Sequence, residues 1–196
     1  MKPKLQVIIA STRPGRVGPT VAAWFHDFAK QHDQFAVELV DLADFNLPLL
    51  DEPVHPRLQD YQHAHTRAWS KSVAAADAYV FVCPEYNYSP PPSLINALDY
   101  VYTEWNYKPC GFVSYGGVSG GLRAVQAARL QVTTLKMMPM VEGVAIPMVA
   151  QLLDEEGVFQ ANELIDDAAA TMLTEMRFWA DGLAAMRTEK AQREAA

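Results

Sequence analysis

Residues 78–99 read AYVFVCPEYNYSPPPSLINALD, an apolar run followed by a polar loop that is rich in proline. The run at 78–83 is typical of a strand buried on both faces of a parallel sheet. Open α/β sheets bind their ligands where such strands end. The loop at 84–89 offers backbone amides and carbonyls, an Asn amide and two tyrosines on a chain stiffened by proline. This combination suits a loop that forms hydrogen bonds along the edge of a flat ring.

Similar apolar runs recur along the chain and alternate with segments of helical spacing. The runs lie at 7–10, 36–40, 78–83, 111–115 and 142–146, and the helical segments at 17–31, 58–76, 92–102, 120–137 and 162–187. Strands that alternate with helices predict a parallel sheet with right-handed crossovers, and five strands are too few for an eight-stranded barrel. We therefore expect an α/β sandwich with helices on both faces of its sheet.

Length and composition indicate one globular domain. The chain has 196 residues, half of them hydrophobic and a fifth charged, so we expect a domain over 1–187 and a charged tail, either a fraying helix end or disordered, over 188–196. The net charge is -7, and acidic and basic residues are mixed along the chain, so the sequence shows no basic patch that would bind nucleic acid or an anionic membrane. No cleavage-site pattern or membrane-length apolar stretch is present, which predicts a cytoplasmic protein whose partners are small molecules or copies of itself.

Several residues that could carry chemistry are given a structural interpretation. Cys83 and Cys110 stand at the edges of apolar runs, so we expect buried thiols, with a redox role left open for Cys83 beside the loop. We expect His55, His63 and His65 to be solvated rather than metal ligands, because His-x-His spacing on a helix points the two rings apart. Acidic residues after the second strand, Asp41 and Asp44, are interpreted as surface charge.

The loop at 84–89 resembles the Pro-Glu-Tyr-Asn loop of the NADPH-dependent FMN reductases, a flavodoxin-like family that includes quinone, azo-dye and chromate reductases. Residues 11–18, STRPGRVG, follow the first apolar run and are similar to the FMN-phosphate loop of that family. Residues 116–121, GGVSGG, follow the fourth run and resemble its third flavin loop. The resemblance extends from residue 5 to about residue 147. It implies a flavodoxin-like three-layer sandwich whose five-stranded sheet has the order 2-1-3-4-5.

The first loop has the groups that an oxyanion requires. The hydroxyls of Ser11 and Thr12 and the amides at the next helix start donate to phosphate, and arginines add charge-assisted bonds. The Gly-Lys-Ser/Thr ending of a nucleotide triphosphatase loop is absent. The alternative is a basic turn with two solvated arginines. By resemblance, the phosphate contacts are Ser11, Arg13, Arg16, Val17 and Gly18.

The resemblance assigns the flavin ring to the second and third loops. Pro84, Glu85, Tyr86 and Asn87 would hold the pyrimidine edge, and Tyr88 would flank the ring or the nicotinamide. Glu85 could instead cap a helix, and Tyr88 could pack in the core or at an interface.

In the third loop the implied contacts are Ser114, Tyr115, Gly116 and Gly117, since glycines leave room for a ring and allow positive φ. A purely structural glycine turn is the alternative, with Tyr115 as a core aromatic.

The expected function is FMN-dependent hydride transfer from NADPH or NADH to a quinone, azo compound, metal oxyanion or free flavin. The chemistry belongs to the cofactor, so no catalytic side chain and no metal is assigned. The alternatives are a flavodoxin-type electron carrier and a flavin-free regulatory domain of the same fold.

A homodimer or homotetramer is also expected, because the helices after the second and third loops carry more apolar residues than one sheet face should need. These residues are Leu94, Leu98, Val101, Tyr102, Trp105, Leu122, Val125, Leu130 and Leu135.

Overall fold

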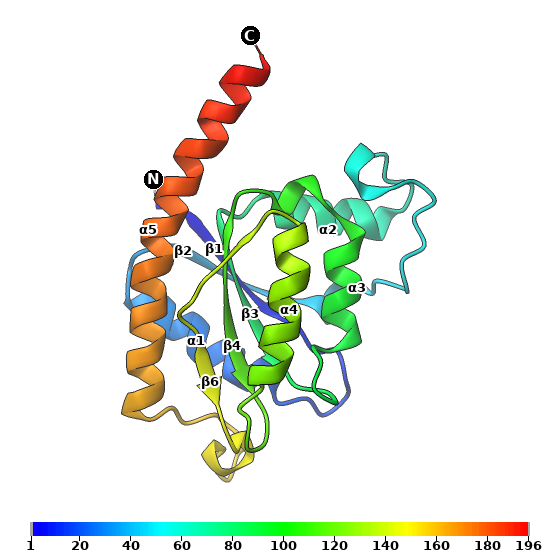
Figure 1. The fold of residues 1–196 in the computed structure, drawn as a ribbon. Coiled ribbons are helices and arrows are strands. Elements are labelled where there is room, and N and C mark those ends of the chain that lie inside the picture. Colours follow the sequence, from blue (N-terminus) through cyan, green and yellow to red (C-terminus); the bar gives the residue numbers. More distant parts are fainter. Residues whose placement is uncertain (1, 196) are drawn as a thin grey trace.

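The computed structural model describes residues 2–195, in which helices cover both faces of a parallel sheet (Figure 1). The strands are β1 (Lys4–Ile9), β2 (Ala36–Asp41), β3 (Ala78–Pro84), β4 (Pro109–Tyr115), β5 (Met138–Pro139) and β6 (Val144–Ile146). The α-helices are α1 (Gly18–Gln31), α2 (Ala64–Ala74), α3 (Pro92–Tyr100), α4 (Leu122–Thr134) and α5 (Glu163–Glu194). Short 3-10 helices occur at Leu42–Phe45, Pro56–Leu58, Thr103–Trp105 and Val149–Leu152.

The sheet has the order β2-β1-β3-β4-β5 with parallel pairing, which confirms the predicted topology. Its fifth strand is divided. β5 pairs with the start of β4 at Pro109 and Cys110, whereas β6 pairs with the end of the same strand. The Met140 N–H still donates to the Cys110 carbonyl over 2.8 Å, and pairing with β4 then stops until Val144. The strand predicted at 142–146 therefore corresponds to β6 alone, which begins at Val144.

β2 forms one edge of the sheet and differs from the other long strands in burial. Only Val40 among its residues is buried, whereas β3 and β4 are buried throughout. The expectation that the second strand is buried on both faces is wrong, because an edge strand has a neighbour on one side only.

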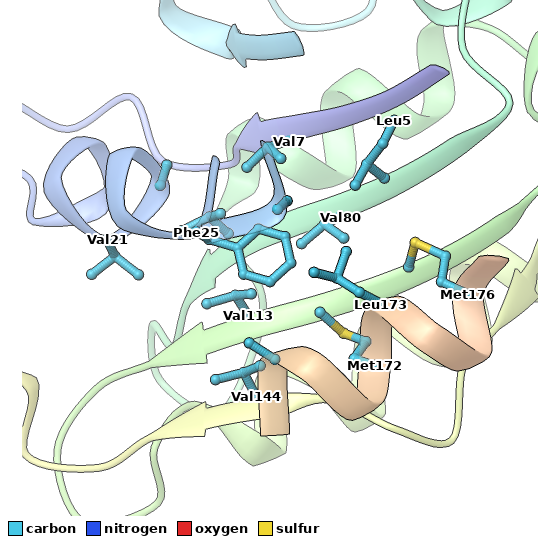
Figure 2. Packing of buried hydrophobic residues seen from close by; sticks show 14 of the residues in the cluster. Leu5, Val7, Val21, Phe25, Val80, Val113, Val144, Met172, Leu173 and Met176 are labelled. Carbon is cyan, nitrogen blue, oxygen red and sulfur yellow. The ribbon is translucent and has the colours of Figure 1, made fainter. Parts of the chain in front are cut away.

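Two layers of helices enclose the sheet. α1 and α5 cover one face, and α2, α3 and α4 cover the other (Figure 1). Figure 2 shows the first face, where Phe25 of α1 and Leu173 of α5 pack over Val80 and Val113. α5 approaches β4 so closely that a Cβ on Gly111 would lie 2.7 Å from a methionine sulfur of that helix.

The helix boundaries follow local chemistry. Pro19 and Pro92 lie in the first turns of α1 and α3, where the missing N–H has no helical acceptor to lose. α2 begins later than predicted, because the 3-10 turn Pro56–Leu58, a left-handed Gln59 and an extended His63 precede it. α5 continues past residue 188 to Glu194, so the described part of the tail is helical and projects beyond the sheet (Figure 1). Within residues 2–195, no helix has the length and apolar character that crossing a membrane requires.

Most of the residues expected at a subunit seam belong to the core of this chain. Leu94, Leu98, Val101 and Trp105 are at most 1% exposed, and Val125 and Leu135 are buried as well. They pack against the sheet beneath α3 and α4. Only Leu122 and Leu130 of that set have large exposed fractions, 50% and 74%. The inference of a seam from surplus apolar surface is therefore wrong for the buried residues.

The two histidines at 63 and 65 do not point apart. His63 has extended backbone angles and precedes α2, so its ring stacks on that of His65, with ring centroids 5.1 Å apart and planes inclined by 9°. Nε2 of His65 lies 3.0 Å from a carboxylate oxygen of Asp51. The described residues contain no group of three or more His, Cys, Asp or Glu that could hold a metal ion.

Candidate functional site

The three loops identified in the sequence follow β1, β3 and β4, which are neighbours in the sheet. Parallel strands end at the same edge, so the loops gather at one end of the molecule, the lower end in Figure 1. Side chains join them directly: the Ser11 and Tyr115 hydroxyls lie 3.3 Å apart, and Glu85 contacts the third loop through Ser119. The structure brings together all three predicted segments.

Arg13 is the free cation of the first loop. It is exposed and makes no ion pair within residues 2–195. Within that same range, the backbone N–H groups of Thr12, Arg13 and Val17 have no hydrogen-bond acceptor. Val17 is the N-cap of α1, whose first turn contains no acidic residue. Unpaired amides and a guanidinium at a helix start form an environment that favours an anion.

Arg16, the second arginine of this loop, is already engaged. Its guanidinium donates to the Ser11 carbonyl over 2.7 Å and forms an ion pair with Asp41 at the end of β2. Asp41 also accepts a hydrogen bond of 2.9 Å from the Ala43 N–H. The interpretation of Asp41 as surface charge is wrong, and so is the picture of Arg16 as a solvated side chain. The pair holds the first loop against β2.

Close packing beneath the first loop explains Gly18. A Cβ at this position would lie 2.8 Å from Ser11 Oγ and 2.9 Å from Tyr115 Oη, distances that real Cβ atoms do not show. Both partners are buried. Burial raises the pKa of Tyr115 to about 12, although the hydrogen bond with Ser11 acts in the opposite direction. Tyr115 is therefore a neutral phenol and part of the core, as its alternative interpretation expects.

The second loop is a tight hairpin. Tyr86 and Ser89 exchange backbone hydrogen bonds of 2.9 and 3.0 Å, and the two residues between them, Asn87 and Tyr88, have φ of 52° and 68°. Two consecutive positive φ angles are the pattern of a type I′ turn. The Asn87 side chain is exposed and has no partner among the described residues. The hairpin therefore presents a free amide side chain at its tip.

Glu85 links the second loop to the third. Its carboxylate accepts hydrogen bonds from the backbone N–H of Arg123 (3.1 Å), from Nε of the same residue (2.7 Å) and from Ser119 Oγ (3.0 Å). Burial acts to raise the pKa of Glu85, but the hydrogen bonds from Arg123 and Ser119 outweigh it and lower the pKa. The helix-cap interpretation is thus correct in kind, but Glu85 caps α4 rather than the helix that follows the prolines.

Tyr88 belongs to the same arrangement. Its ring is 66% exposed, and the Arg123 guanidinium lies 3.8 Å from the ring centroid. This is a cation–π contact at the protein surface. Tyr88 is therefore not a core residue.

The third loop folds back on the end of β4. The Ser114 hydroxyl donates a hydrogen bond of 2.7 Å to the Gly120 carbonyl, so its proton is already paired within the loop. Gly121 has φ of +81°, and a Cβ there would lie 2.9 Å from both Ser114 Cβ and Tyr115 N. At Gly117, in contrast, a Cβ would meet nothing within 4 Å. The glycines serve two purposes, since Gly121 is required for packing and Gly117 leaves open surface.

The cysteines behave as buried hydrophobic residues, as predicted. Cys83 and Cys110 are fully buried, and burial raises the pKa of each thiol. The Cys83 thiol donates to the adjacent Pro84 carbonyl over 3.3 Å. A neutral, inaccessible thiol is a poor nucleophile, so nothing here favours a redox role for Cys83.

The free groups at this edge fit FMN. Arg13 and the unpaired amides of the first loop match a phosphate, and the Asn87 side chain matches the hydrogen-bonding edge of an isoalloxazine. The open surface at Gly117 provides room beside them. The fold and these three loops together define a flavodoxin-like flavin-binding protein.

Comparison with known proteins identifies the family. Residues 3–151 match the family described as NADPH-dependent FMN reductase. An NAD(P)H-dependent FMN reductase of Schizosaccharomyces pombe is 41% identical over 161 residues, which cover 75% of this chain and 80% of the relative. A quinone reductase of Pseudomonas putida is 32% identical over 162 residues, 77% of this chain and 81% of the relative. The chain belongs to the NADPH-dependent FMN reductase family and is an oxidoreductase that uses FMN with NAD(P)H as electron donor.

Solved structures support the fold. The NAD(P)H:acceptor oxidoreductase FerB of Paracoccus denitrificans superposes with a TM-score of 0.71 over 92% of this chain and 98% of its own. The two sequences are 19% identical, so this likeness concerns the fold alone.

Sequence reasoning missed Arg123 as a partner of the second loop. One signal for it was present, since a cation in the first turn of a helix opposes the helix dipole and calls for an anionic neighbour. The sequence offered no comparable signal that Asp41 pairs with Arg16, because 25 residues separate the two.

Proposed function

We propose that FMN binds across the three loops, with its phosphate at the first, the pyrimidine edge at the second and the remainder of the ring at the third. The residues assigned to this site are Ser11, Arg13, Arg16, Val17, Gly18, Pro84, Glu85, Tyr86, Asn87, Tyr88, Ser114, Tyr115, Gly116 and Gly117. The observation that carries the proposal is the unpaired Arg13 guanidinium beside unpaired loop amides.

The assigned residues divide into contact and positioning residues. Arg13 and Asn87 have free polar groups, so we assign them direct contacts with the phosphate and the ring edge. The polar groups of Arg16, Glu85 and Ser114 already form hydrogen bonds within the protein, so we assign these residues a positioning role in the loops. This division places the charged phosphate contact on Arg13 rather than Arg16.

When bound, FMN supplies the redox chemistry, taking a hydride from NAD(P)H and passing electrons to an acceptor. The side chains bind and orient the flat reactants. Tyr115 and Cys83 remain neutral at physiological pH because burial raises the pKa of each, so neither supplies a charged group beneath the site.

A small quinone is the acceptor that we favour among quinones, azo compounds, metal oxyanions and free flavin. A flat acceptor suits a site built for flat rings, and the Pseudomonas putida relative is named a quinone reductase. Steady-state oxidation of NADH and NADPH with benzoquinone, an azo dye, chromate and free FMN tests this choice. The highest kcat/KM with the quinone supports it, whereas a higher value with any of the other three contradicts it.

FMN binding itself is tested by titrating the flavin with protein and following flavin fluorescence. We expect quenching with a Kd on the order of micromolar or below, because the phosphate contact is charge-assisted. Absence of quenching at a protein concentration on the order of 10 micromolar would refute the assignment.

We also propose a homodimer that could pair into a tetramer, with the outer side of α4 at the seam. Leu122 and Leu130 of α4 are 50% and 74% exposed, and Val141, which lines a shallow hollow with Leu122, is 80% exposed. Leu130→Glu is a better probe than a change at Leu98, which is buried. Sedimentation should show an oligomer that Leu130→Glu dissociates, and a monomeric parent protein would contradict the seam.

A cytoplasmic location is proposed on two grounds. The reaction consumes NAD(P)H, and Cys83 and Cys110 are both free thiols. Fractionation of cells that express the tagged chain tests this location, and recovery with the membrane or secreted fraction would contradict it.

A further inference from the structure

A cleft lies beside the first loop, between the segment that follows β2 and the start of α3. It encloses about 500 Å³, a volume within the range of small-molecule sites. Its walls come from the first loop at Thr12, from the segment after β2 at Ala43 to Leu49, and from the start of α3 at Ser93. Thr12 is the only one of these residues that is next in sequence to residues assigned to FMN, so the cleft is largely separate from the proposed FMN site.

We propose that this cleft receives the adenosine end of NAD(P)H, an inference that rests on the proposed function. The cleft opens at the carboxyl edge of the sheet and shares the first loop with the FMN site through Thr12. In open α/β sheets, ligands lie across this edge, and the loop after the first strand and the end of the second lie side by side. A dinucleotide extending from the flavin therefore meets this cleft.

The lining suits a flat heteroaromatic ring. Leu47 and Leu49 on one wall and Pro92 on the other provide apolar contact for the ring faces. The Thr12 hydroxyl has no hydrogen-bond partner within residues 2–195, and the Asn46 side chain makes only one bond there, of 3.5 Å from its amide nitrogen to the Asp44 carbonyl. A hydroxyl and an amide that are free to pair are the groups that recognise a purine edge and a ribose.

The wall of the cleft that carries Leu47 and Leu49 is held in place by hydrogen bonds within the protein, before any ligand binds. The Asn96 side chain of α3 accepts a hydrogen bond of 2.9 Å from the Leu50 N–H. Its amide nitrogen donates a hydrogen bond of 2.6 Å to the Pro48 carbonyl. The Tyr100 hydroxyl, one turn further along α3, lies 3.0 Å from the same carbonyl and 2.9 Å from a carboxylate oxygen of Asp51, either of which can accept its single proton. Leu49 is nevertheless 83% exposed, an unusual position for a leucine that the chain holds so firmly. A preorganised apolar rim reduces the entropy lost on binding.

The charge of the lining defines which part of the donor fits. No lysine or arginine lines the cleft. A 2′-phosphate would therefore gain no ion pair from these walls, whereas the adenosine that NADH and NADPH share would make the same contacts. Changes in the cleft should alter the KM for the two donors to the same extent.

The test compares two cleft variants with one control in the FMN-loaded protein. Ala43→Phe fills the cleft, and Leu49→Ala removes part of its rim. Leu58→Ala changes a leucine that is 71% exposed and outside the cleft. KM is measured for NADH, for NADPH and for reduced nicotinamide mononucleotide, which lacks the adenosine. Equilibrium binding of 5′-AMP is measured by calorimetry, and FMN affinity by fluorescence.

We expect Ala43→Phe to raise KM for NADH and NADPH by about tenfold, as for a lost pocket contact, and to weaken 5′-AMP binding. Leu49→Ala should act in the same direction and, being a rim change, keeps the test valid if Ala43→Phe fails to fold. KM for the truncated donor, FMN affinity and all properties of Leu58→Ala should stay unchanged.

Three results would overturn the proposal: equal KM changes for full and truncated donors, no change for either, or no binding of 5′-AMP to the unaltered protein. A shift in sedimentation with Leu49→Ala at unchanged KM would instead make the cleft rim a contact with a second copy of the chain. Failure of the proposed function has a separate signature, since the unaltered protein would then bind no FMN or oxidise none of the donors.

Discussion

The carboxylate of Glu85, one residue past β3, accepts hydrogen bonds from both the backbone N–H (3.1 Å) and Nε (2.7 Å) of Arg123 in the first turn of α4. This contact joins two of the three loops assigned to FMN. The hydrogen bonds from Arg123 and Ser119 lower the pKa of Glu85 against the effect of burial, so the carboxylate stays ionised at neutral pH. Arg123 also covers the Tyr88 ring, which fixes the hairpin tip.

Replacing Glu85 by Gln should weaken FMN binding without unfolding the protein. A hydrogen bond to a charged group contributes roughly 1.5–3 kcal/mol. Its loss should loosen the second and third loops, and part of the lost free energy should be measured as a higher Kd for FMN. Fluorescence titration gives the Kd. Glu175→Gln, at an exposed position on α5, is the matched control. An unchanged FMN Kd in Glu85→Gln would mean that the loops keep their arrangement without this contact.

Arg13 and Arg16 should differ in their effects. Arg13→Ala should raise the Kd for FMN by roughly 10-fold to 150-fold, as expected for a lost charged hydrogen bond, and leave riboflavin affinity unchanged. Arg16→Ala breaks the pair with Asp41, so it should lower stability and weaken both ligands together. Titration with FMN and riboflavin separates the two. If Arg16→Ala discriminates between the ligands and Arg13→Ala does not, the two assignments must be exchanged.

Glycine substitutions should separate packing from open space in the third loop. Gly121→Ala places a Cβ 2.9 Å from Tyr115 N at φ of +81°, so we expect destabilisation of about 1–3 kcal/mol. Gly117→Ala meets nothing within 4 Å and should change the free energy of unfolding by less than about 0.5 kcal/mol. Urea denaturation measures both. Similar losses in the two variants would argue against the loop geometry described here.

Lys108 should make stability depend on pH. Its ammonium is buried against the Val73 carbonyl and the Tyr79 hydroxyl, and burial, with the charge of Arg187 adding to it, lowers its pKa to about 8 from the usual 10.5. Between these values the unfolded chain binds more protons than the folded one, so this lysine's destabilising effect fades as pH rises through that window.

The free energy of unfolding of the unaltered protein, minus that of Lys108→Met, should therefore increase from pH 8 to pH 10.5 by about 2–3 kcal/mol. Lys71→Met, an exposed lysine on α2, should show no such trend. A flat difference for Lys108→Met would mean that the ammonium is charged in the fold throughout this range.

The sequence predicts the order and type of the elements well, because runs such as 78–83 and 111–115 are apolar throughout and permit no competing interpretation. The prediction fails where burial depends on a neighbour far along the chain. The apolar residues of α3 and α4 suggest a seam by periodicity, yet Leu98 and Val125 fill the core on that side of the sheet. Periodicity identifies the apolar side of a helix but does not say what covers it.

The site shows the same division. The three loops are visible as motifs at strand ends, and the structure brings them together. Which polar groups remain free is not visible, because it depends on pairs such as Arg16 with Asp41 and Glu85 with Arg123. Both pairs bridge segments that are distant in sequence. The position of Arg123 in a first turn indicates an anionic neighbour, but no local pattern identifies which residue it is. The stacked rings of His63 and His65 arise from an extended residue before α2 that the helical pattern conceals.

Anaerobic reduction of the FMN-loaded protein tests the central claim most directly. The protein is mixed with a stoichiometric amount of NADH or NADPH, the visible absorbance of the flavin is followed, and benzoquinone is then added. We predict that the absorbance is lost with the pyridine nucleotide and returns with the quinone, and that Arg13→Ala fails at FMN concentrations that saturate the unaltered protein. Retention of FMN whose absorbance neither nucleotide changes would contradict the account.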